Sequence, residues 1–271
     1  MRDATDSLKV QTGWYWDAEF IGFFVAQHLG LYSLERLTVE FLEGGPEVEP
    51  EHLLLCGAVD IALTVRETTL SLIAAGADLE VVGAQYKQDP LALLVRACST
   101  ISTLADLRGC TVAVPDISRD SLIQSLSRAG IEASTMKFVG YDGSAVPFQD
   151  ANGVDAVVGY ITSLPLDLAR SEIPTRSFLL AADTGPTTLQ NLIVVRGSQQ
   201  PAIRHRVRKW LAASAEGWRV NASDSSYYPR ALRSTWFNNT QRCVDDEIEH
   251  NRRQLEFMGD PKAFLKIDST H

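Results

Sequence analysis

The sequence predicts an α/β fold made of two lobes, and three observations lead to that prediction. Strand-like and helix-like patterns alternate along most of the chain, which is typical of a mostly parallel sheet. Two apolar strand patterns, at residues 91–97 and 191–195, have no helix directly before them, so we expect them to cross between lobes. The 271 residues are also enough for two compact lobes.

These observations give explicit boundaries. We expect residues 1–92 and 192–271 to form lobe 1 and residues 97–187 to form lobe 2. The crossings should fall near residues 91–97 and 190–195.

The first βαβ unit lies in residues 9–46. A strand pattern ends at Gln11, and apolar residues from Phe20 to Leu29 then recur at helical spacing. A second strand pattern covers residues 37–42 and stops at a Gly-Gly-Pro turn.

Three consecutive aromatic residues, Trp14, Tyr15 and Trp16, fill the loop between that first strand and its helix. Ligands of open α/β sheets bind at the carboxyl ends of the strands, where this loop would lie. Neighbouring side chains point in different directions, so all three cannot be core residues. We expect at least one to face a ligand; core packing or a surface contact is the alternative.

The remaining elements follow the same alternation. We expect strands at residues 59–65, 79–85, 111–114, 136–139, 154–158 and 178–181. We expect helices at residues 49–56, 70–75, 118–129, 148–151 and 163–170, and a helical pattern from residue 201 to the end.

Charge and hydropathy narrow the classes of partner. The net charge is −9, which argues against nucleic acid and anionic membranes, because both require a basic face. No apolar run approaches the ~20 residues that span a bilayer. The first ten residues lack the apolar segment of a signal peptide, so either the protein is cytosolic or a leader was removed.

Cysteine and histidine spacing predicts no metal site. None of the four cysteines forms a CxxC pair and no two histidines have metal-ligand spacing. We expect isolated buried thiols, although Cys98 and Cys110 could pair if their strands lie side by side.

Three phrases resemble one family. Residues 14–63 (WYWDAEFIGFFVAQHLGLYSLERLTVEFLEGGPEVEPEHLLLCGAVDIAL), residues 99–116 (STISTLADLRGCTVAVPD) and residues 152–160 (NGVDAVVGY) occur in the order seen in NMT1/THI5-like (SsuA/THI5-like) substrate-binding proteins. The resemblance extends from about residue 9 to residue 218. It implies a type II periplasmic-binding-protein fold, with two α/β lobes joined by two crossing strands and the ligand cleft between them.

The resemblance also implies a function. It points to the solute-binding receptor of an ABC importer, which closes on a small planar nitrogen heterocycle such as a thiamine pyrimidine precursor or a flavin, without catalysis. The expected partners are that small molecule and the importer's permease, with no nucleic acid. The expected state is an extracytoplasmic monomer, periplasmic or lipid-anchored, provided that a leader has been removed.

The family has an enzyme branch that synthesises pyrimidines, and this chain departs from it. The branch carries a lysine for pyridoxal phosphate and a reacting histidine, and the matching positions here are Thr64 and Thr68. Its cysteine-rich iron motif matches residues 183–195, which contain no cysteine. We therefore expect no cofactor and no enzyme activity. A ligand-sensing domain of a signalling protein is an alternative, whereas no G-x-S-x-G motif supports a hydrolase.

Candidate ligand residues follow the expected strand ends of both lobes. Those of lobe 1 are Trp14, Tyr15, Gly44, Gly45, Thr64, Arg66, Gln85 and Tyr86, and those of lobe 2 are Asp116, Ser118, Arg119, Tyr160 and Thr184. Gly44 and Gly45 could bring backbone N–H groups close to a ligand, or form a plain turn. Arg66 either forks onto a carboxylate, sulfonate or carbonyl or pairs with Glu67.

The lobe 2 candidates have their own alternatives. We expect Ser118 or Asp116 to be the N-cap of a helix, whose free N–H groups would suit an anionic or carbonyl oxygen. Capping alone would also explain both residues. Tyr160 is expected to stack on the ligand or to hydrogen-bond to it.

Overall fold

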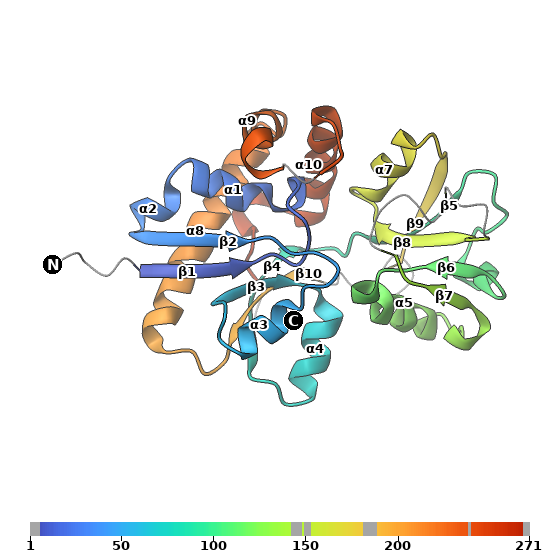
Figure 1. The fold of residues 1–271 in the computed structure, drawn as a ribbon, viewed down its shortest axis with the longest axis horizontal. Helices are drawn as coiled ribbons and strands as arrows, with labels where there is room; N and C mark the ends of the chain where they lie inside the picture. Colours follow the sequence, from blue (N-terminus) through green and yellow to red (C-terminus); the bar gives the residue numbers. More distant parts are fainter. Residues whose placement is uncertain (1–5, 142–147, 149–152, 181–188, 238–239, 268–271) are drawn as a thin grey trace. The chain divides into compact units, whose positions relative to one another are not determined.

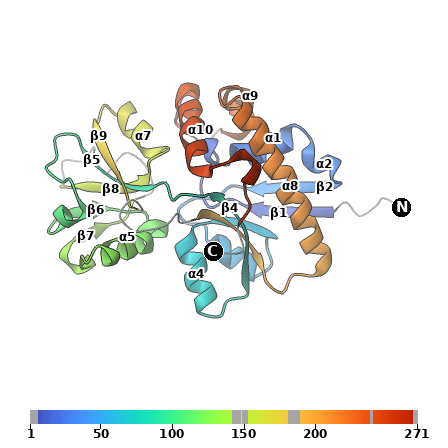
Figure 2. The same cartoon turned by 180° about the vertical axis from the view of Figure 1, so that it is seen from behind.

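The computed structural model describes residues 6–141, 148, 153–180, 189–237 and 240–267. The chain forms two compact units, shown in Figure 1 and Figure 2. Unit 1 comprises Met1–Lys87 and Leu189–His271, and unit 2 comprises Gln88–Thr188. Each unit has its own sheet and its own core.

The sheet of unit 1 is mixed. Its strands are β1 (Asp6–Gln11), β2 (Leu37–Leu42), β3 (Ile61–Thr64), β4 (Leu79–Tyr86) and β10 (Gln190–Arg196), in the spatial order β2-β1-β3-β10-β4. β1 pairs in parallel with β2 and β3, whereas β10 runs antiparallel between β3 and β4. The carboxyl ends of β1, β2, β3 and β4 therefore meet at one edge of the sheet.

Helices cover both faces of this sheet. The helical elements of unit 1 are η1 (Ala18–Phe20), α1 (Ile21–His28), α2 (Leu31–Leu34), α3 (Pro50–Leu55), α4 (Arg66–Ala74), α8 (Pro201–Ser223), α9 (Tyr227–Trp236), α10 (Val244–Met258) and η4 (Pro261–Ala263). In Figure 1, α1, α9 and α10 lie on one side of the sheet, and α3 and α4 lie on the other. Aromatic rings fill the core under α1: Phe23 stacks on Trp210 and Phe24 stacks on Trp236.

Unit 2 repeats the mixed arrangement. Its strands are β5 (Leu91–Arg96), β6 (Thr111–Ala113), β7 (Lys137–Val139), β8 (Ala156–Tyr160) and β9 (Thr175–Leu179), in the order β7-β6-β8-β5-β9. Its helical elements are η2 (Leu104–Leu107), α5 (Asp116–Arg128), η3 (Ala133–Thr135) and α7 (Leu164–Arg170). β6 is parallel to β7 and β8, and β5 is antiparallel to β8 and β9.

The two segments expected as crossings are strands within the two sheets. β5 belongs to the sheet of unit 2 and β10 to the sheet of unit 1, and each runs antiparallel to its neighbours. The chain leaves unit 1 after Lys87 and returns to it at Leu189. Because these two strands are antiparallel, each sheet is mixed rather than parallel throughout.

Some elements differ in their bounds from the expected ones. α4 begins at Arg66 rather than at residue 70, because its first turn contains β-branched threonines that weaken the helical pattern. β9 ends at Leu179 rather than at residue 181. The helix expected at residues 148–151 lies outside the described residues apart from Phe148.

The four cysteines are free thiols, and Cys98 and Cys110 are not bonded to each other. Cys56, Cys98 and Cys243 are exposed and Cys110 is half-buried, so the expectation of buried thiols was wrong. Within the described ranges, no group of three or more histidine, cysteine, aspartate or glutamate side chains is arranged to hold a metal.

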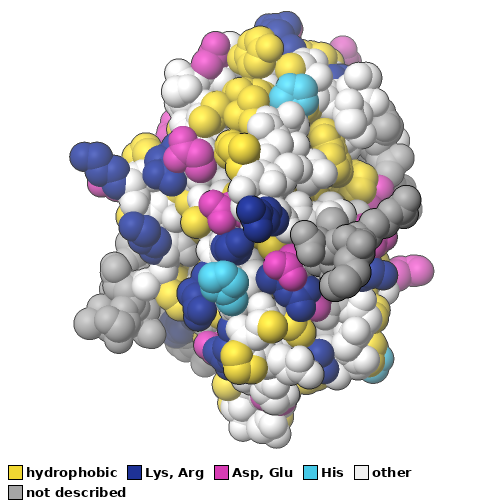
Figure 3. All heavy atoms as spheres, turned by 90° about the vertical axis from the view of Figure 1, so that its left-hand side faces the viewer, with side chains coloured by type: hydrophobic (Ala, Val, Ile, Leu, Met, Phe, Trp, Pro, Cys, Tyr) yellow, Lys and Arg dark blue, Asp and Glu magenta, His cyan; other side chains and the backbone are white. Residues whose placement is uncertain are grey.

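No helix among the described residues is both long and apolar enough to cross a membrane. Basic and acidic side chains are interspersed on the face drawn in Figure 3. Surface ion pairs such as Lys209–Glu35 and Arg204–Glu80 fit this mixture of charges.

Candidate functional site

The loop after β1, residues 12–17, lies at the carboxyl edge of the unit 1 sheet, and we call it the aromatic loop. The Thr12 hydroxyl donates to the Trp14 carbonyl oxygen at 3.0 Å. The Gly44 N–H donates to the Thr12 Oγ1 at 3.0 Å and to the same Trp14 carbonyl at 3.1 Å. The loop is therefore tied to the end of β2, and the Gly44 N–H is used inside the protein.

The three aromatic side chains of this loop have different surroundings. Trp14 is half-buried and Tyr15 is 43% exposed, and their rings meet edge to face with centroids 5.6 Å apart. A Cβ atom on Gly45 would lie 3.2 Å from the Tyr15 ring, so Gly45 lets this ring lie close to the backbone. The Trp16 ring packs instead against Phe24 and Trp236. Trp16 is also half-buried, but its ring packs against these two side chains, so Trp14 and Tyr15 are the two aromatic residues that we consider for a ligand.

Arg66 begins α4 directly after β3 and forms an ion pair with its neighbour. Its Nη2 lies 2.6 Å from Oε1 of Glu67, which is buried. The Arg66 backbone N–H donates to the Gln190 side-chain oxygen at 2.7 Å, and Gln190 Nε2 donates to Glu67 Oε2 at 3.2 Å. The Arg66 Nε is buried without a hydrogen-bond partner. Of the two alternatives, the structure contains the pairing with Glu67.

A hydrogen-bonded chain continues from this point into the core. Asn191, next to Gln190 at the start of β10, has a positive φ of 49°. Its side-chain amide donates to Glu19 Oε1 at 2.6 Å. Burial, followed by the nearby Asp17 carboxylate, raises the pKa of Glu19 to about 8. A buried carboxyl in this position is therefore at least partly protonated at neutral pH.

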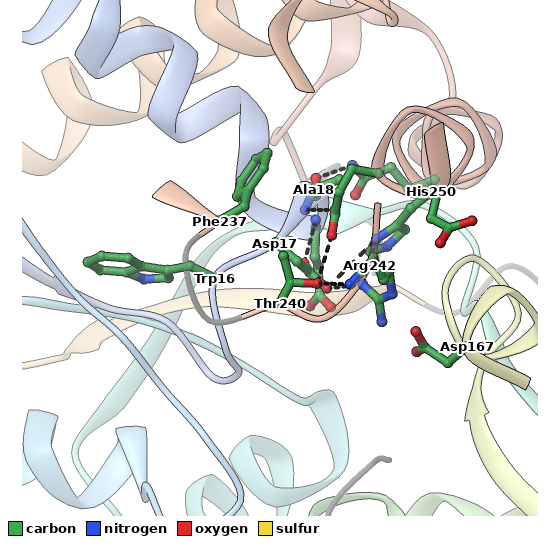
Figure 4. Close-up of polar contacts among 12 residues, drawn as sticks. Trp16, Asp17, Ala18, Asp167, Phe237, Thr240, Arg242 and His250 are labelled. Carbon is green, nitrogen blue, oxygen red and sulfur yellow. Dashed lines mark hydrogen bonds and ion pairs between the residues drawn. The ribbon is translucent and has the colours of Figure 1, made fainter. Parts of the chain in front are cut away.

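A buried charged cluster lies beside the aromatic loop, as Figure 4 shows. Asp17 Oδ2 accepts a hydrogen bond from Arg242 Nη1 at 2.5 Å and lies 3.7 Å from His250 Nδ1. Glu247 Oε2 accepts from the Ala18 N–H at 2.9 Å. Burial raises the pKa of Glu247 to about 7 and lowers the pKa of His250 to about 4.

Sequence reasoning missed this cluster. Asp17 stands inside the WYWDAEF stretch, next to a helix whose neighbouring residues are apolar. An acidic residue just before such an apolar helix could have predicted a buried cationic or hydrogen-bonding partner. Its cationic partner comes from a residue 225 positions later, and no local pattern identifies that residue.

Three of the expected lobe 1 residues lie in the interior of unit 1. Gln85 and Tyr86 are both 0% exposed, and both hydrogen-bond to Gln254 of α10. Thr64 is buried, and its hydroxyl donates to Glu51 Oε1 at 2.6 Å. A ligand at the surface of this sheet edge would not reach these side chains, so we leave them out of the proposed site.

The expected lobe 2 residues lie in unit 2. Asp116 and Arg119 are in the first turn of α5 and form an ion pair of 3.2 Å, and Ser118 is buried in the same turn. The N-cap of α5 is Pro115 and makes no side-chain capping bond, so the prediction of Ser118 or Asp116 as N-cap was wrong. A proline before the first turn sets an extended backbone that suits a helix start without a cap.

The other two unit 2 candidates are Tyr160 and Thr184. Tyr160 ends β8, is half-buried and packs against the core of the unit. Thr184 lies outside the described residues.

The positions where the enzyme branch would hold pyridoxal phosphate do not fit that cofactor. A Schiff base requires a lysine amine, whereas Thr64 has a buried hydroxyl that is hydrogen-bonded to Glu51. Thr68 is a half-buried residue of α4.

Comparison with known proteins assigns the family. The family described as "NMT1/THI5 like" matches residues 17–224, and the chain belongs to it. The fold is that of the periplasmic binding proteins, and it is shared by a ligand-binding component of an ABC-type import system.

Curated relatives are distant and carry different names. The chain is 25% identical over 166 residues to a "Putative thiamine biosynthesis protein" of Haemophilus influenzae, covering 60% of this chain and 53% of the relative. It is 24% identical over 208 residues to the riboflavin-binding protein RibY of Chloroflexus aurantiacus, covering 73% and 58%. It is 24% identical over 172 residues to a 4-amino-5-hydroxymethyl-2-methylpyrimidine phosphate synthase of Legionella pneumophila, covering 61% and 54%. The chain thus spans 53% to 58% of the length of these relatives.

Solved structures support the fold. The periplasmic aliphatic sulphonate-binding protein SsuA of Escherichia coli superposes with a TM-score of 0.71 at 20% identity, covering 91% of this chain and 78% of that one. The periplasmic nitrate-binding protein NrtA of Synechocystis gives a TM-score of 0.68 at 13% identity, covering 91% and 70%. At these identities the likeness concerns the fold alone.

Proposed function

We propose that this chain is the solute-binding component of an ABC-type importer and that it binds a small planar nitrogen heterocycle without catalysing a reaction. The observation that carries the proposal is the Trp14–Tyr15 pair at the carboxyl edge of the unit 1 sheet. A half-buried indole beside an exposed phenol offers an aromatic ring for stacking and a polar hydroxyl. Binding sites for small molecules combine such apolar surface with a few polar groups that fix orientation.

Polar groups for that second role stand at the same sheet edge. Arg66 has a buried Nε without a hydrogen-bond partner, and its Nη2 already holds Glu67. A ligand carbonyl or anionic oxygen would accept from this guanidinium. We keep Gly45 as the residue that lets the Tyr15 ring approach, and Asp116, Arg119 and Tyr160 as a proposed ligand surface on unit 2. Ser118 is buried and Thr184 lies outside the described residues, so both remain predictions from the sequence alone.

The names of two relatives support the ligand class. One relative is named a riboflavin-binding protein and another a thiamine biosynthesis protein, and flavins and thiamine precursors both contain planar nitrogen rings. The proposal includes an extracytoplasmic location, an importer permease as partner and a monomeric state. Its binding mode includes ligand-driven closure, which small-angle scattering would detect as a smaller radius of gyration.

Enzyme activity is the second candidate, because one relative is named a pyrimidine phosphate synthase. Thr64 and Thr68 at the expected lysine and histidine positions argue against it. After incubation with pyridoxal phosphate and gel filtration without reduction, the protein should retain no stoichiometric cofactor absorbance. Retention of one equivalent by the native protein would favour the enzyme instead.

The binding test begins with native mass spectrometry of the purified chain, to detect a small molecule that co-purifies. Riboflavin and 4-amino-5-hydroxymethyl-2-methylpyrimidine are then titrated by calorimetry. Trp14→Ala should weaken binding of whichever probe binds, by roughly tenfold for one lost stacking contact of ~1–1.5 kcal/mol.

Tyr227→Ala is the matched control, since it removes another aromatic side chain that is 56% exposed, on α9. This variant should bind like the wild type. Equal affinity of Trp14→Ala and the wild type would refute the stacking role, and no binding of either probe would refute the ligand class.

A further inference from the structure

A segment near the C-terminus contacts the aromatic loop, and also the residues directly after that loop, through several buried side chains. We call residues 236–258 the C-terminal segment; the structure describes 236–237 and 240–258 of it. The family match ends at residue 224, so this segment lies after the matched region. All of these contacts are within unit 1.

Backbone groups directly after the loop are bound by α10. Glu247 accepts from the Ala18 N–H through Oε2 at 2.9 Å and from the Thr240 hydroxyl through Oε1 at 2.9 Å. Gln254 donates to the Ala18 carbonyl oxygen. Both backbone polar groups of Ala18 are therefore satisfied by side chains of the C-terminal segment, which fixes the start of η1.

The end of the loop itself is held by charge. Arg242 Nη1 bonds to Asp17 Oδ2 at 2.5 Å and lies 3.4 Å from His250 Nδ1. The Asp17 side chain is 7% exposed and that of Arg242 is 12% exposed. A buried carboxylate without its paired cation is strongly unfavourable. The backbone at Asp17 is therefore held where the side chain can reach Arg242.

Two further contacts determine the direction of the loop. The Trp16 N–H donates to Glu43 Oε1 at 2.9 Å, and the Trp16 ring meets the Trp236 ring with centroids 5.2 Å apart. Figure 4 shows the Trp16 ring directed away from the cluster of Asp17, Thr240, Arg242 and His250. These contacts hold Trp16 and the buried Asp17, and Tyr15 is the most exposed of the three aromatic residues of the loop.

We propose that Arg242 is a positioning residue for ligand binding: through Asp17 it holds the aromatic loop in the conformation that presents Trp14 and Tyr15. The inference rests on the proposed function for its ligand, whereas the loop geometry can be tested without any ligand. It makes the C-terminal segment a structural part of the binding site, although this segment lies after the family match.

Arg242→Gln is the test variant, because it removes the charge and keeps a polar side chain. Arg242→Lys is the rescue variant, since an ammonium keeps the positive charge and can bond to the Asp17 carboxylate. Arg230→Gln is the control: Arg230 pairs with Asp245 at 3.2 Å, joins α9 to α10, and is exposed.

Hydrogen exchange on the full chain, without ligand, measures the loop directly. In Arg242→Gln the amides of Trp16 and Ala18 should exchange faster by on the order of a hundredfold, the loss expected for a broken buried ion pair. Amides of β10 in the same unit should keep their wild-type rates. Arg242→Lys should recover most of the protection, and Arg230→Gln should match the wild type.

Three exchange results would overturn the inference: unchanged rates at Trp16 and Ala18, an equal rise in β10, or no recovery in Arg242→Lys. Titration with riboflavin and 4-amino-5-hydroxymethyl-2-methylpyrimidine then tests the consequence. We expect Arg242→Gln to bind about tenfold more weakly. This is the size of effect seen when a residue that only orients a ligand-contacting group is removed, as at metal sites.

The two sets of results separate the two hypotheses. Faster exchange with unchanged affinity would overturn the positioning role, because a displaced loop would then not matter to the ligand. If the wild type binds neither probe, the proposed function fails in its ligand class, and the exchange rates alone decide whether Arg242 holds the loop.

Discussion

Gly22 of α1 lies directly against the indole ring of Trp218 in α8, and a Cβ atom at Gly22 would overlap that ring. On the facing helix, a Cβ atom at Gly217 would lie 2.8 Å from the Cβ of Ala26. The two helices can approach this closely because neither glycine has a side chain. α1 directly follows the aromatic loop and η1, so this helix contact supports the element from which the loop extends.

The first prediction follows from this contact. Gly22→Ala should lower the free energy of unfolding of unit 1 by about 1–3 kcal/mol, because Trp218 is fully buried and has no room to move. All five tryptophans, at positions 14, 16, 210, 218 and 236, belong to unit 1, so tryptophan fluorescence in urea follows this unit.

Ser33→Ala is the control for Gly22→Ala, because it adds no atoms and changes an exposed helical position of the same unit. This variant should leave the fluorescence transition in place. A midpoint for Gly22→Ala equal to that of the wild type would show that α1 and α8 can separate without cost.

A second prediction concerns the pH dependence of stability. Burial raises the pKa of Glu19 from 4.5 to about 8 and that of Glu247 from 4.5 to about 7, so the folded chain retains protons that the unfolded chain releases. Their contribution to the free energy of unfolding is present below the unfolded pKa of 4.5 and is lost as the pH rises toward 8. His250, with its pKa lowered from 6.5 to about 4, acts in the opposite direction between those values.

Above about pH 6.5, only Glu19 and Glu247 of these three groups still change the stability. Wild-type stability should therefore fall between about pH 6.5 and pH 8. Glu19→Gln should reduce this slope, because the amide oxygen can still accept from Asn191 and carries no charge. Urea unfolding at several pH values measures the slope. Glu256→Gln, an exposed carboxyl change on α10, should retain it, and an unchanged slope in Glu19→Gln would contradict the assignment.

The division into two α/β units could be predicted from the sequence because it depends on local patterns. Residues 37–42 and 191–195 read as strands, and both are strands in the structure. The antiparallel direction of β10 could not be predicted, since it depends on pairing with β3, more than a hundred residues earlier. Strand rhythm alone carries no information on the order of strands in a sheet.

The candidate site shows the same limit. Trp14, Tyr15 and Arg66 follow strands and lie at the sheet edge, as the strand-end rule predicts. Tyr86 also ends a strand, yet Gln254 of α10 lies against it from 168 positions away. Whether a strand end is open or covered is decided by such distant packing, which no local pattern reveals.

A third prediction separates the roles of Arg66. Arg66→Ala should weaken ligand binding by about 1.5–3 kcal/mol if the guanidinium contacts a ligand oxygen, the range for a charge-assisted hydrogen bond. Arg66→Lys should recover only part of that loss, because a point charge cannot reproduce a fork. Titration of both variants with the bound probe measures the effect.

Stability must be followed in the same variants, because Arg66 also neutralises the buried Glu67. Arg230→Ala removes an exposed ion pair and should change neither affinity nor stability. Lower stability with unchanged affinity in Arg66→Ala would assign Arg66 to the Glu67 pair alone.

The last prediction tests the exclusion of Thr64 from the site. Its hydroxyl donates to the buried Glu51, which also accepts from Thr69 at 3.2 Å. Thr64→Val keeps the shape of the side chain and removes one of these two donors. The free energy of unfolding, measured in urea, should therefore be lower by about 1–3 kcal/mol. Ligand affinity at a temperature where the variant is folded should equal that of the wild type.

Thr38→Val, at an exposed position of β2, provides the matched control and should change neither quantity. A loss of affinity in Thr64→Val without a loss of stability would return Thr64 to the ligand site, and would mean that unit 1 opens between β3 and α3 to admit the ligand.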